Sequence, residues 1–419
     1  MFKTNIATGE DIIVKLLYIV NEFPKLSESF VINELYELDK RGHEIIIFSL
    51  SLPNEEIAHE EIYELNLTIY YAQRRSLQSL PDLISKHILN PTVLREAMFV
   101  DSPLYHANCL HLGSQISKII ESEGGVDLIH SHFAASNRLA AVYASAYHSI
   151  PCSVTAHAYE IFSTPNIQRL QRVCSRSDHI VVPSEYNKRY LSEELGVDTE
   201  MTVVPATTNV DKFEPSDGCV SGRLLTVARL VEKKGYEYAI NAVAELVERG
   251  YDVAYHIVGT GEREEALRSQ VRERGIEDYV EFLGHVSDER LETELHEAEI
   301  FVLPCVIASD GDRDVAPVAL KEAMATQTAC VSTSISAIPE LITDSHDGLL
   351  VEPNDSAAVA DALSSLLDDP SRREEIASNG RETVENKFDI SQSVDQLVDV
   401  FQSCIRSHGS RETSDVGGD

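Results

Sequence analysis

Basic residues are scarce in this chain of 419 residues. Thirty-five lysines and arginines stand against 69 aspartates and glutamates, which gives a net charge of −34. Contacts to nucleic-acid phosphates need a basic surface, so this balance argues against general nucleic-acid binding. The acidic residues are scattered along the chain rather than gathered in one tail. Such a surface indicates a halophilic protein, whose charges keep it hydrated and soluble in concentrated salt.

Paired cysteines and long apolar runs are missing as well. The seven cysteines form no C-x-x-C pair, and their odd number predicts scattered reduced thiols rather than a disulfide framework. No signal-peptide pattern opens the sequence, and no apolar run approaches the roughly 18 residues that span a bilayer. We therefore expect a soluble cytoplasmic protein, with peripheral contact to the inner face of the cell membrane as an open alternative.

Apolar residues make up 43% of the chain, enough for packed cores, and the length suits about two to three domains. An apolar run at residues 12–20 predicts a buried strand, which a helix to about residue 40 and a strand at 44–49 follow. This rhythm predicts an α/β fold with a doubly wound parallel sheet. A linker rich in Pro, Ser, Asp and Gly at 214–221 separates a second set of such segments.

Two acidic residues flank a predicted strand–loop–helix junction. The apolar run 300–306 predicts a strand, and Pro317 with the helix formers after it predicts a helix start. Asp314 then lies on the loop and Glu322 in the helix, near the carboxyl end of a strand, where open α/β sheets bind ligands. A helix N-terminus suits a diphosphate, and carboxylates accept hydrogen bonds from sugar hydroxyls. Taken alone, the pair would be explained better as a solvated acidic loop.

Basic residues and glycines follow two further predicted strands. Strand 223–227 precedes a loop with Arg229 and Lys234, two side chains suited to phosphate, although a charged surface turn is the plain alternative. Strand 255–258 ends at Gly259 and Gly261, which let the backbone approach a ligand closely. These glycines are a weak signal, because the third glycine of the dinucleotide fingerprint and a Walker A lysine are both missing.

Histidines mark two strand ends in the first half. His130 and His132 invite a metal interpretation, but no third ligand or acidic partner stands at a recognised spacing, so we expect no metal site. His157 follows a predicted strand at 152–156, a position where loops carry chemistry. A lone histidine is otherwise more often a structural one.

Arginines form a further pattern after His157. Arg169, Arg172 and Arg176 share one face of a predicted helix, where they could meet a pyrophosphate or form an ordinary solvated face. A second basic cluster lies in the irregular stretch 54–112. It would suit either a lipid headgroup layer or a helical insertion packed on the sheet, and it consists of Arg74, Arg75, Lys86 and Arg95.

Taken together, the motifs resemble those of the retaining glycosyltransferases of family 4, particularly members that build exopolysaccharides or lipid-linked glycans. Asp314 and Glu322 stand as in the family's Glu-x7-Glu motif, and residues 228–235 as in its G-R-L-x-x-x-K-G loop. Residues 23–30 are similar to an F-P-x-x-S-E-x-F signature, and residues 127–133 to a D-x-I-H-x-H-F strand end. The sequence departs from the family in having Asp314 for Glu, and Val315 and Ala228 for Gly.

The resemblance implies the GT-B fold, with two Rossmann-like doubly wound parallel-sheet domains, an interdomain cleft, and a C-terminal helix that crosses back to the first domain. We expect an acceptor-binding domain at 1–213, a nucleotide-sugar domain at 220–385, the crossover helix at 386–406 and a disordered tail at 407–419.

The resemblance also implies roles for individual residues. The catalytic group is expected to be His157, Asp314, Glu322 and Lys234. Donor binding is assigned to Arg229, Lys234, Gly259, Gly261, His285, Val286, Asp314, Val318 and Glu322. Acceptor binding is assigned to Ser27, Glu28, His132, Arg169, Arg172 and Arg176. No metal is expected, because the resemblance implies a metal-independent enzyme. No cofactor is expected either, because the nucleoside diphosphate sugar is the donor substrate.

The implied reaction moves a hexose from a nucleoside diphosphate sugar to an acceptor hydroxyl with retention at the anomeric carbon. The acceptor would be a glycan or a lipid-linked glycan. Three alternatives stay open: a nucleotide-sugar epimerase of the same fold, a non-catalytic nucleotide-sugar binder, and a two-domain binder of polyanions, against which the net charge speaks.

Overall fold

The computed structural model describes residues 13–25, 28–53, 62, 65–73, 102–134, 137–163, 166–215 and 218–415. Contacts between Cα atoms divide the chain into two compact units. Unit 1 comprises Met1–Thr155, Arg172–His179 and Val398–Asp419, and unit 2 comprises Ala156–Gln171 and Ile180–Leu397. Among the described residues, no helix combines the length and the apolar character that a membrane span requires.

The first sheet has seven strands in the order β3-β2-β1-β4-β5-β6-β7, and β1 pairs in parallel with both β2 and β4. Its strands are β1 (Lys15–Glu22), β2 (Glu44–Ser51), β3 (Thr68–Tyr71), β4 (Leu128–His132), β5 (Cys152–Thr155), β6 (His179–Val182) and β7 (Met201–Val203). The central strand β1 is buried without interruption from Leu16 to Val20. Such continuous burial is typical of a parallel strand covered on both faces.

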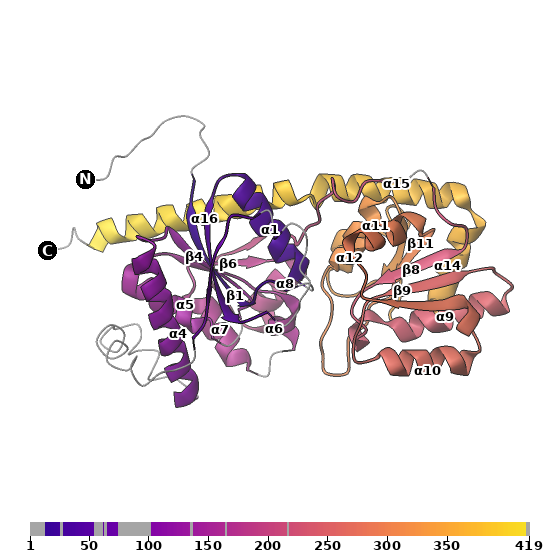
Figure 1. Ribbon diagram of the computed structural model, residues 1–419, viewed down its shortest axis with the longest axis horizontal. Helices are drawn as coiled ribbons and strands as arrows, with labels where there is room; N and C mark the ends of the chain where they lie inside the picture. Colours follow the sequence, from indigo (N-terminus) through magenta and orange to yellow (C-terminus); the bar gives the residue numbers. More distant parts are fainter. Residues whose placement is uncertain are drawn as a thin grey trace. The chain divides into compact units, whose positions relative to one another are not determined.

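Short and long helices connect these strands: α1 (Ser29–Lys40), α4 (Pro103–Ser122), α5 (Leu139–His148), α6 (Ala158–Phe162), α7 (Ile167–Arg176), α8 (Glu185–Arg189) and the π-helical turn η4 (Tyr190–Glu194). Helices α4 and α5 pack side by side in unit 1 (Figure 1). A Cβ atom added at Gly113 of α4 would lie 3.2 Å from the carbonyl oxygen of Ala140, so glycine permits this close helix contact.

The second sheet lies in unit 2 and has six strands in the order β10-β9-β8-β11-β12-β13, all paired in parallel. Its strands are β8 (Arg223–Val227), β9 (Ala254–Val258), β10 (Val280–Gly284), β11 (Ile300–Leu303), β12 (Ala329–Thr333) and β13 (Leu349–Val351). Successive residues of one strand enter different cores: Leu224 packs in one apolar cluster and Leu225 in another. Because side chains alternate along a strand, this separation means that both faces of the sheet are covered.

The helices of this half are α9 (Tyr236–Glu248), α10 (Glu264–Arg274), α11 (Asp288–Glu297), α12 (Val318–Ala325), α13 (Ile338–Leu341), α14 (Ser356–Asp368) and α15 (Pro370–Lys387), with 3-10 turns η5 (Glu232–Lys234) and η6 (Glu277–Tyr279). Helix α14 lies beside α9, where Arg249 forms an ion pair of 2.6 Å with Asp361. The alternation of strands and helices confirms the predicted α/β fold.

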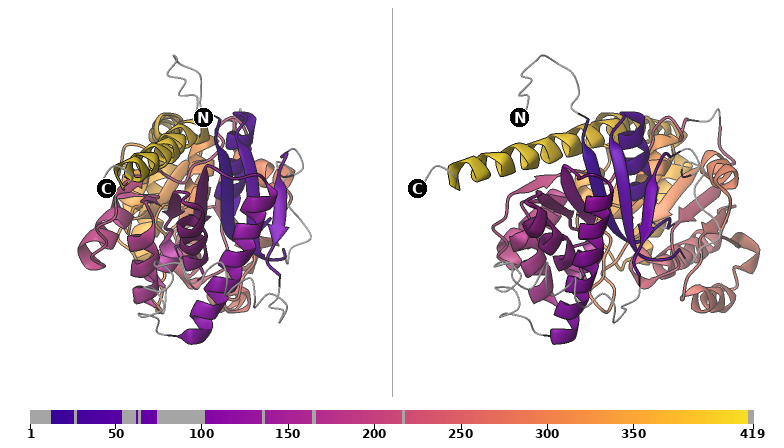
Figure 2. Two further views of the ribbon diagram at one scale, coloured as in Figure 1. Left: turned by 90° about the vertical axis from the view of Figure 1, so that its left-hand side faces the viewer. Right: turned by 60° about the vertical axis from the view of Figure 1, so that its left-hand side comes forward.

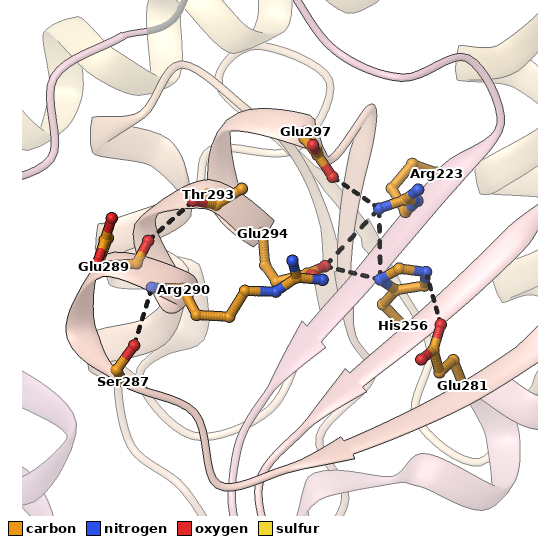
Figure 3. A network of polar contacts seen from close by, with 9 residues as sticks. All are labelled: Arg223, His256, Glu281, Ser287, Glu289, Arg290, Thr293, Glu294 and Glu297. Carbon is orange, nitrogen blue, oxygen red and sulfur yellow. Dashed lines mark hydrogen bonds and ion pairs between the residues drawn. The ribbon is translucent and has the colours of Figure 1, made fainter.

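A buried polar network interrupts the core of unit 2 (Figure 3). Glu294 of α11 is fully buried, and its carboxylate lies 2.7 Å from Nδ1 of His256 and 3.8 Å from Nη1 of Arg223. Arg290, one turn earlier on α11, forms a further short ion pair with Glu294. The network joins α11 to β8 and β9, and the carboxylate of Glu294 is the group that its other members share.

The last helix, α16 (Ile390–Asp415), begins in unit 2 and continues in unit 1 as one long yellow helix (Figures 1 and 2). Here the structure differs from the sequence prediction, which ends this helix at 406 and places a disordered tail after it. Once a helix is formed, each further residue adds a hydrogen bond at little cost, so polar residues can extend it.

Candidate active site

The site is built where the strand order of the second sheet reverses. Strands β8 and β11 are neighbours in the sheet, although 72 residues lie between the end of β8 and the start of β11. Strands β9 and β10 follow on the outer side of β8, and strands β12 and β13 follow on the outer side of β11. The loops 228–235 and 304–317 leave from the carboxyl ends of these two parallel strands. In open α/β sheets this edge, at the point of reversal, is the place where ligands bind.

Backbone geometry holds the two loops close together. The turn η5 ends at Gly235, whose φ of +68° lies in the left-handed region. A Cβ atom at this position would lie only 1.8 Å from the carbonyl oxygen of Pro304 in the other loop. Both observations require glycine at position 235, the glycine that the sequence places at the end of the Lys-Gly pattern.

Three consecutive residues of the first loop each bind a residue of the second. The Glu232 carboxylate accepts hydrogen bonds of 2.9 Å from both the backbone N–H and the hydroxyl of Ser309. Lys233 forms an ion pair of 3.0 Å with Asp312, and Lys234 one of 2.5 Å with Asp314. The predicted residues Lys234 and Asp314 are therefore direct partners. We call the set of Glu232, Lys233, Lys234, Ser309, Asp312 and Asp314 the loop clasp.

The charges of the loop clasp are strongly coupled because its ionic groups are mostly buried. Burial acts to raise the pKa of Asp314, but the ammonium groups of Lys234 and Lys233 lower it below its ordinary value. Burial also acts to lower the pKa of Lys234, and Asp314 reverses this effect and raises that pKa. Both groups are thus held in their charged forms. The thiol of Cys305 lies 3.7 Å from Asp314, and burial raises its pKa, so it contributes no thiolate.

Arg229 and Glu322 lie on the segments that neighbour the loop clasp along the chain. Arg229 has an exposed side chain on the first loop, and its charge acts on Lys234. Glu322 is half-buried on α12, the helix that follows the second loop. Val318 is the first residue of α12, and Pro317 occupies the N-cap position just before it. The backbone N–H groups of this helix start are oriented as in anion-binding sites.

The other predicted donor residues lie at the same edge of the sheet. Gly259 follows β9 with a φ of +132°, and a Cβ there would lie 2.0 Å from the carbonyl oxygen of Ala228. Gly261 approaches Leu230 in a similar way, so both glycines serve contacts between neighbouring loops. His285 and Val286 follow β10, His285 exposed and Val286 half-buried.

His157 and the three arginines predicted to bind the acceptor lie on segments that connect strands of the first sheet. His157 precedes α6, and its backbone N–H donates a hydrogen bond of 2.6 Å to Glu160, which fixes the helix start. Arg169, Arg172 and Arg176 all lie on α7 and are half-buried. Helix α6 also contacts the second loop, since the guanidinium of Arg313 lies 4.7 Å from the centre of the Phe162 ring. The roles of His157 and the three arginines stay predictions.

Two other acceptor predictions fall on buried groups. Glu28 is 8% exposed and forms an ion pair of 2.7 Å with Lys25. His132 is 1% exposed, and its Nε2 lies 3.1 Å from a carboxylate oxygen of Glu34, an acidic partner that sequence spacing does not reveal. Ser27 and the basic cluster Arg74, Arg75, Lys86 and Arg95 lie outside the described residues.

Sequence reasoning missed three groups at the site. Two of them, Lys233 and Asp312, belong to the loop clasp. In the sequence, only their position next to the predicted residues Lys234 and Asp314 could have indicated this. Ser336, in the turn after β12, has a φ of +51°, and its hydroxyl oxygen is buried without a hydrogen-bond partner within the described parts of the chain. An unsatisfied buried hydroxyl at this edge indicates a place where a polar ligand can bind.

Comparison with protein families divides the chain into two matched regions. Residues 27–212 match the family described as Glycosyltransferase Family 4, and residues 221–383 match the family described as Glycosyl transferases group 1. A relative that covers nearly the whole length is a putative colanic acid biosynthesis glycosyltransferase of Escherichia coli. It is 29% identical over 401 residues, which are 90% of this chain and 96% of the relative. An amylovoran biosynthesis glycosyltransferase of Erwinia amylovora is 27% identical over 93% of this chain and 99% of its own.

Solved structures show the same fold. HepE of Anabaena, crystallised with UDP, superposes with a TM-score of 0.73 at 17% identity over 93% of this chain and all of its own. Sucrose-phosphate synthase of Thermosynechococcus elongatus also reaches 0.73, at 16% identity over 94% of this chain and all of its own. The chain therefore belongs to the glycosyltransferases of group 1 and family 4 and has their GT-B fold with two parallel α/β sheets.

Proposed function

We propose that the protein transfers a hexose from a nucleoside diphosphate sugar to a hydroxyl of a cell-surface glycan or its lipid-linked precursor, with retention at the anomeric carbon. The observation that carries this proposal is the loop clasp at the point of strand-order reversal. There Lys234 and the exposed Arg229 offer positive charge beside the start of α12. Preorganised cations of this kind stabilise the charge that grows on a departing diphosphate.

The relatives support the type of product. Two of them, which match along nearly their whole lengths, are named for the biosynthesis of colanic acid and of amylovoran. HepE has been crystallised with UDP and with UDP-glucose, which supports a nucleotide-sugar donor for this chain. We place Arg229 and Lys234 at the diphosphate, Glu322 at the ribose, and Asp314 and His157 at the donor sugar. The donor sugar is a substrate, and the proposed transfer uses no cofactor.

Substitutions at the site test this assignment. Lys234→Ala and Glu322→Ala should each abolish most transfer while the protein stays folded, since they remove a charge at the diphosphate and a hydrogen-bond acceptor at the ribose. Lys387→Ala and Glu382→Ala are matched controls, because both side chains are exposed on α15. Transfer near the wild-type rate in both site variants would contradict the assignment.

The donor is best identified by thermal unfolding with UDP-, GDP- and ADP-sugars. A ligand at a hundredfold excess over its dissociation constant should stabilise the protein by about 2.7 kcal/mol. Radiolabelled donor then distinguishes the classes of activity. Label in an acceptor supports transfer, an isomerised donor in the absence of acceptor supports an epimerase, and binding without turnover supports a non-catalytic protein. If no nucleotide sugar raises the unfolding temperature, the proposed function is wrong.

The proposed function also includes a lipid-linked acceptor and contact of the enzyme with the membrane. A cytoplasmic enzyme with peripheral membrane contact would reach a lipid-linked acceptor at the inner face of the membrane. Sedimentation with vesicles of anionic lipid tests this contact, with Arg74→Glu and Arg75→Glu as the changes. Unchanged binding of the double variant would reject the basic cluster as the contact.

A further inference from the structure

A polar cluster lies on one face of the seven-stranded sheet in unit 1. The strand register places Tyr18 of β1 beside His130 of β4, and His130 beside Ser153 of β5. His132 shares that face, because residues two apart on a strand point to the same side. The neighbours of Tyr18, Leu17 and Ile19, instead join the apolar core that the other face of the sheet carries.

The cluster is almost completely removed from solvent. Tyr18 and His130 are 0% exposed and His132 is 1% exposed. Phe401 of α16 covers it, with its ring centroid 5.0 Å from that of His130. The side chain of Glu34, which reaches the cluster from α1, keeps 16% of its surface exposed. A carboxylate and two imidazoles thus converge in a buried place, and of the three side chains that of Glu34 keeps the most contact with solvent.

The donor atoms lie close enough to share one ligand. One potential metal-binding atom each from Glu34, His130 and His132 lies within 4.8 Å of the other two. Nε2 of His132 is 3.1 Å from Oε1 of Glu34, and the Tyr18 hydroxyl donates a hydrogen bond of 2.7 Å to the same oxygen. Ligands of a tetrahedral zinc ion are about 3.4 Å apart, given bonds of about 2.0–2.1 Å. A small rotation of the long Glu34 side chain would reach this spacing.

The surroundings of His130 also fit a metal ligand. Nδ1 of His130 lies 2.8 Å from the hydroxyl of Ser153, and Nε2 lies 3.0 Å from that of Thr155. A neutral imidazole donates from one nitrogen and accepts at the other, and hydroxyl groups rotate to match either role. An ion at one nitrogen would displace the hydroxyl that nitrogen now contacts, while the other nitrogen would keep its hydroxyl partner, an arrangement that commonly orients metal-bound histidines.

We propose that Glu34, His130 and His132 form a binding site for one divalent transition-metal ion of the zinc type, with the Tyr18 hydroxyl near a fourth position. Two nitrogen donors and one carboxylate suit zinc or cobalt, whereas calcium and magnesium prefer oxygen donors alone. The bound ion would tie α1 to β4. The three ligands lie in unit 1, whereas the loop clasp lies in unit 2, and His132 is also one of the residues predicted to bind the acceptor.

Metal titration of the full chain tests the proposal. After treatment with a chelator, the protein is titrated with Zn²⁺ and Co²⁺ by calorimetry and by the visible absorption of tetrahedral Co²⁺. We expect one ion per chain, and a rise in the unfolding temperature with Zn²⁺ but not with Mg²⁺. The visible Co²⁺ bands separate this site from surface carboxylates, which bind cations without nitrogen ligands.

Variants identify the ligands. His132→Gln and Glu34→Gln should each weaken Zn²⁺ binding by at least about tenfold, and Ser153→Ala should weaken it to a similar or smaller extent. His346→Gln is the control, since His346 is exposed in unit 2. If a variant of a metal ligand does not fold, the Zn²⁺ affinity of Ser153→Ala and the Co²⁺ titration of the wild type still test the proposal. Absence of tetrahedral Co²⁺ bands in the wild type, or wild-type affinity in the variants, would overturn the proposal.

Discussion

Asp314 forms an ion pair with Lys234, the residue that we propose binds the donor diphosphate. The Asp314 carboxylate lies 2.5 Å from the ammonium group of Lys234 and 3.6 Å from that of Lys233. A donor diphosphate would therefore have to compete with Asp314 for the same ammonium group. The departure from the family's usual Glu is thus placed in direct contact with the lysine that the proposed function needs.

Asp314→Asn should bind a free nucleoside diphosphate more tightly while losing transfer activity. A competing contact between exposed charges is worth at most ~1 kcal/mol, and this pair is largely buried, so we expect at least about a fivefold gain in affinity. Calorimetry with UDP, GDP and ADP measures this, and Asp310→Asn, an exposed acid of the same loop, is the control. Unchanged or weaker nucleotide binding in Asp314→Asn would refute the competition, whereas a wild type that binds no nucleotide would refute the proposed function instead.

Lys321 is a fully buried cation beside Glu322. Its ammonium group donates hydrogen bonds to the carbonyl oxygens of Ala206 and, at 3.2 Å, of Ala316. Burial lowers its pKa to about 7, and the nearby charge of Glu322 only partly opposes this shift. In the unfolded chain the same group titrates near its ordinary pKa of about 10.4.

Stability should therefore rise with pH above about 7, because the unfolded chain then binds a proton that the folded chain has released. The gain from this group should be about 2 kcal/mol between pH 7 and about 8.5. Buried tyrosines and cysteines with raised pKa values act in the opposite direction, so the test is a difference. Urea unfolding of the wild type and of Lys321→Met should diverge with pH by this amount, and parallel curves would contradict the prediction.

At the scale of elements, α11 is fastened to the sheet by charge as well as by apolar packing. Glu294 is fully buried and meets His256, Arg290 and Arg223, which come from two strands and the helix itself (Figure 3). Sequence periodicity predicts the helix but not this network, because the partners of Glu294 on β8 and β9 are 71 and 38 positions away.

Glu294→Gln should destabilise unit 2 by ~1–3 kcal/mol, because it removes the buried carboxylate that His256 and Arg290 contact, whereas Arg223 keeps its ion pair of 3.0 Å with Glu297. Glu289→Gln, on the exposed side of the same helix, should change the free energy of unfolding by less than about 0.5 kcal/mol. Urea unfolding followed by circular dichroism measures both variants. Equal stability of the two would show that the network contributes shape rather than charge.

At the scale of the whole molecule, the net charge of −34 dominates. Like charges repel one another and oppose compactness, and salt screens them over about 10 Å at 0.1 M but about 3 Å at 1 M. We propose on this ground that the protein is adapted to high salt.

The unfolding temperature should accordingly rise between about 0.1 M and molar NaCl, by several degrees or more. Differential scanning fluorimetry across a salt series measures this. Potassium chloride should act similarly, because the effect is one of screening rather than of a specific ion. An unfolding temperature that is flat or falls with salt would exclude the adaptation.

The succession of strands and helices follows from the amino-acid sequence alone, because apolar periodicity and turn residues are local properties. The sequence also placed Arg229, Lys234, Asp314 and Glu322 after strands of one predicted sheet, and it identified the family through motifs that lie within short segments. Gly235 shows why this worked: the turn that ends the lysine pattern requires glycine for reasons of local conformation and of one backbone contact.

The pairing of charged side chains, in contrast, depends on how the chain folds. Lys233 contacts Asp312, which lies 79 positions away in the sequence, and His132 contacts Glu34, which lies 98 positions away. No rule of sequence spacing predicts contacts over such separations. The register of parallel strands and the packing of helices on them fix these pairs. Burial then makes the pairs matter, since charge interactions that water would screen become strong where the fold excludes it.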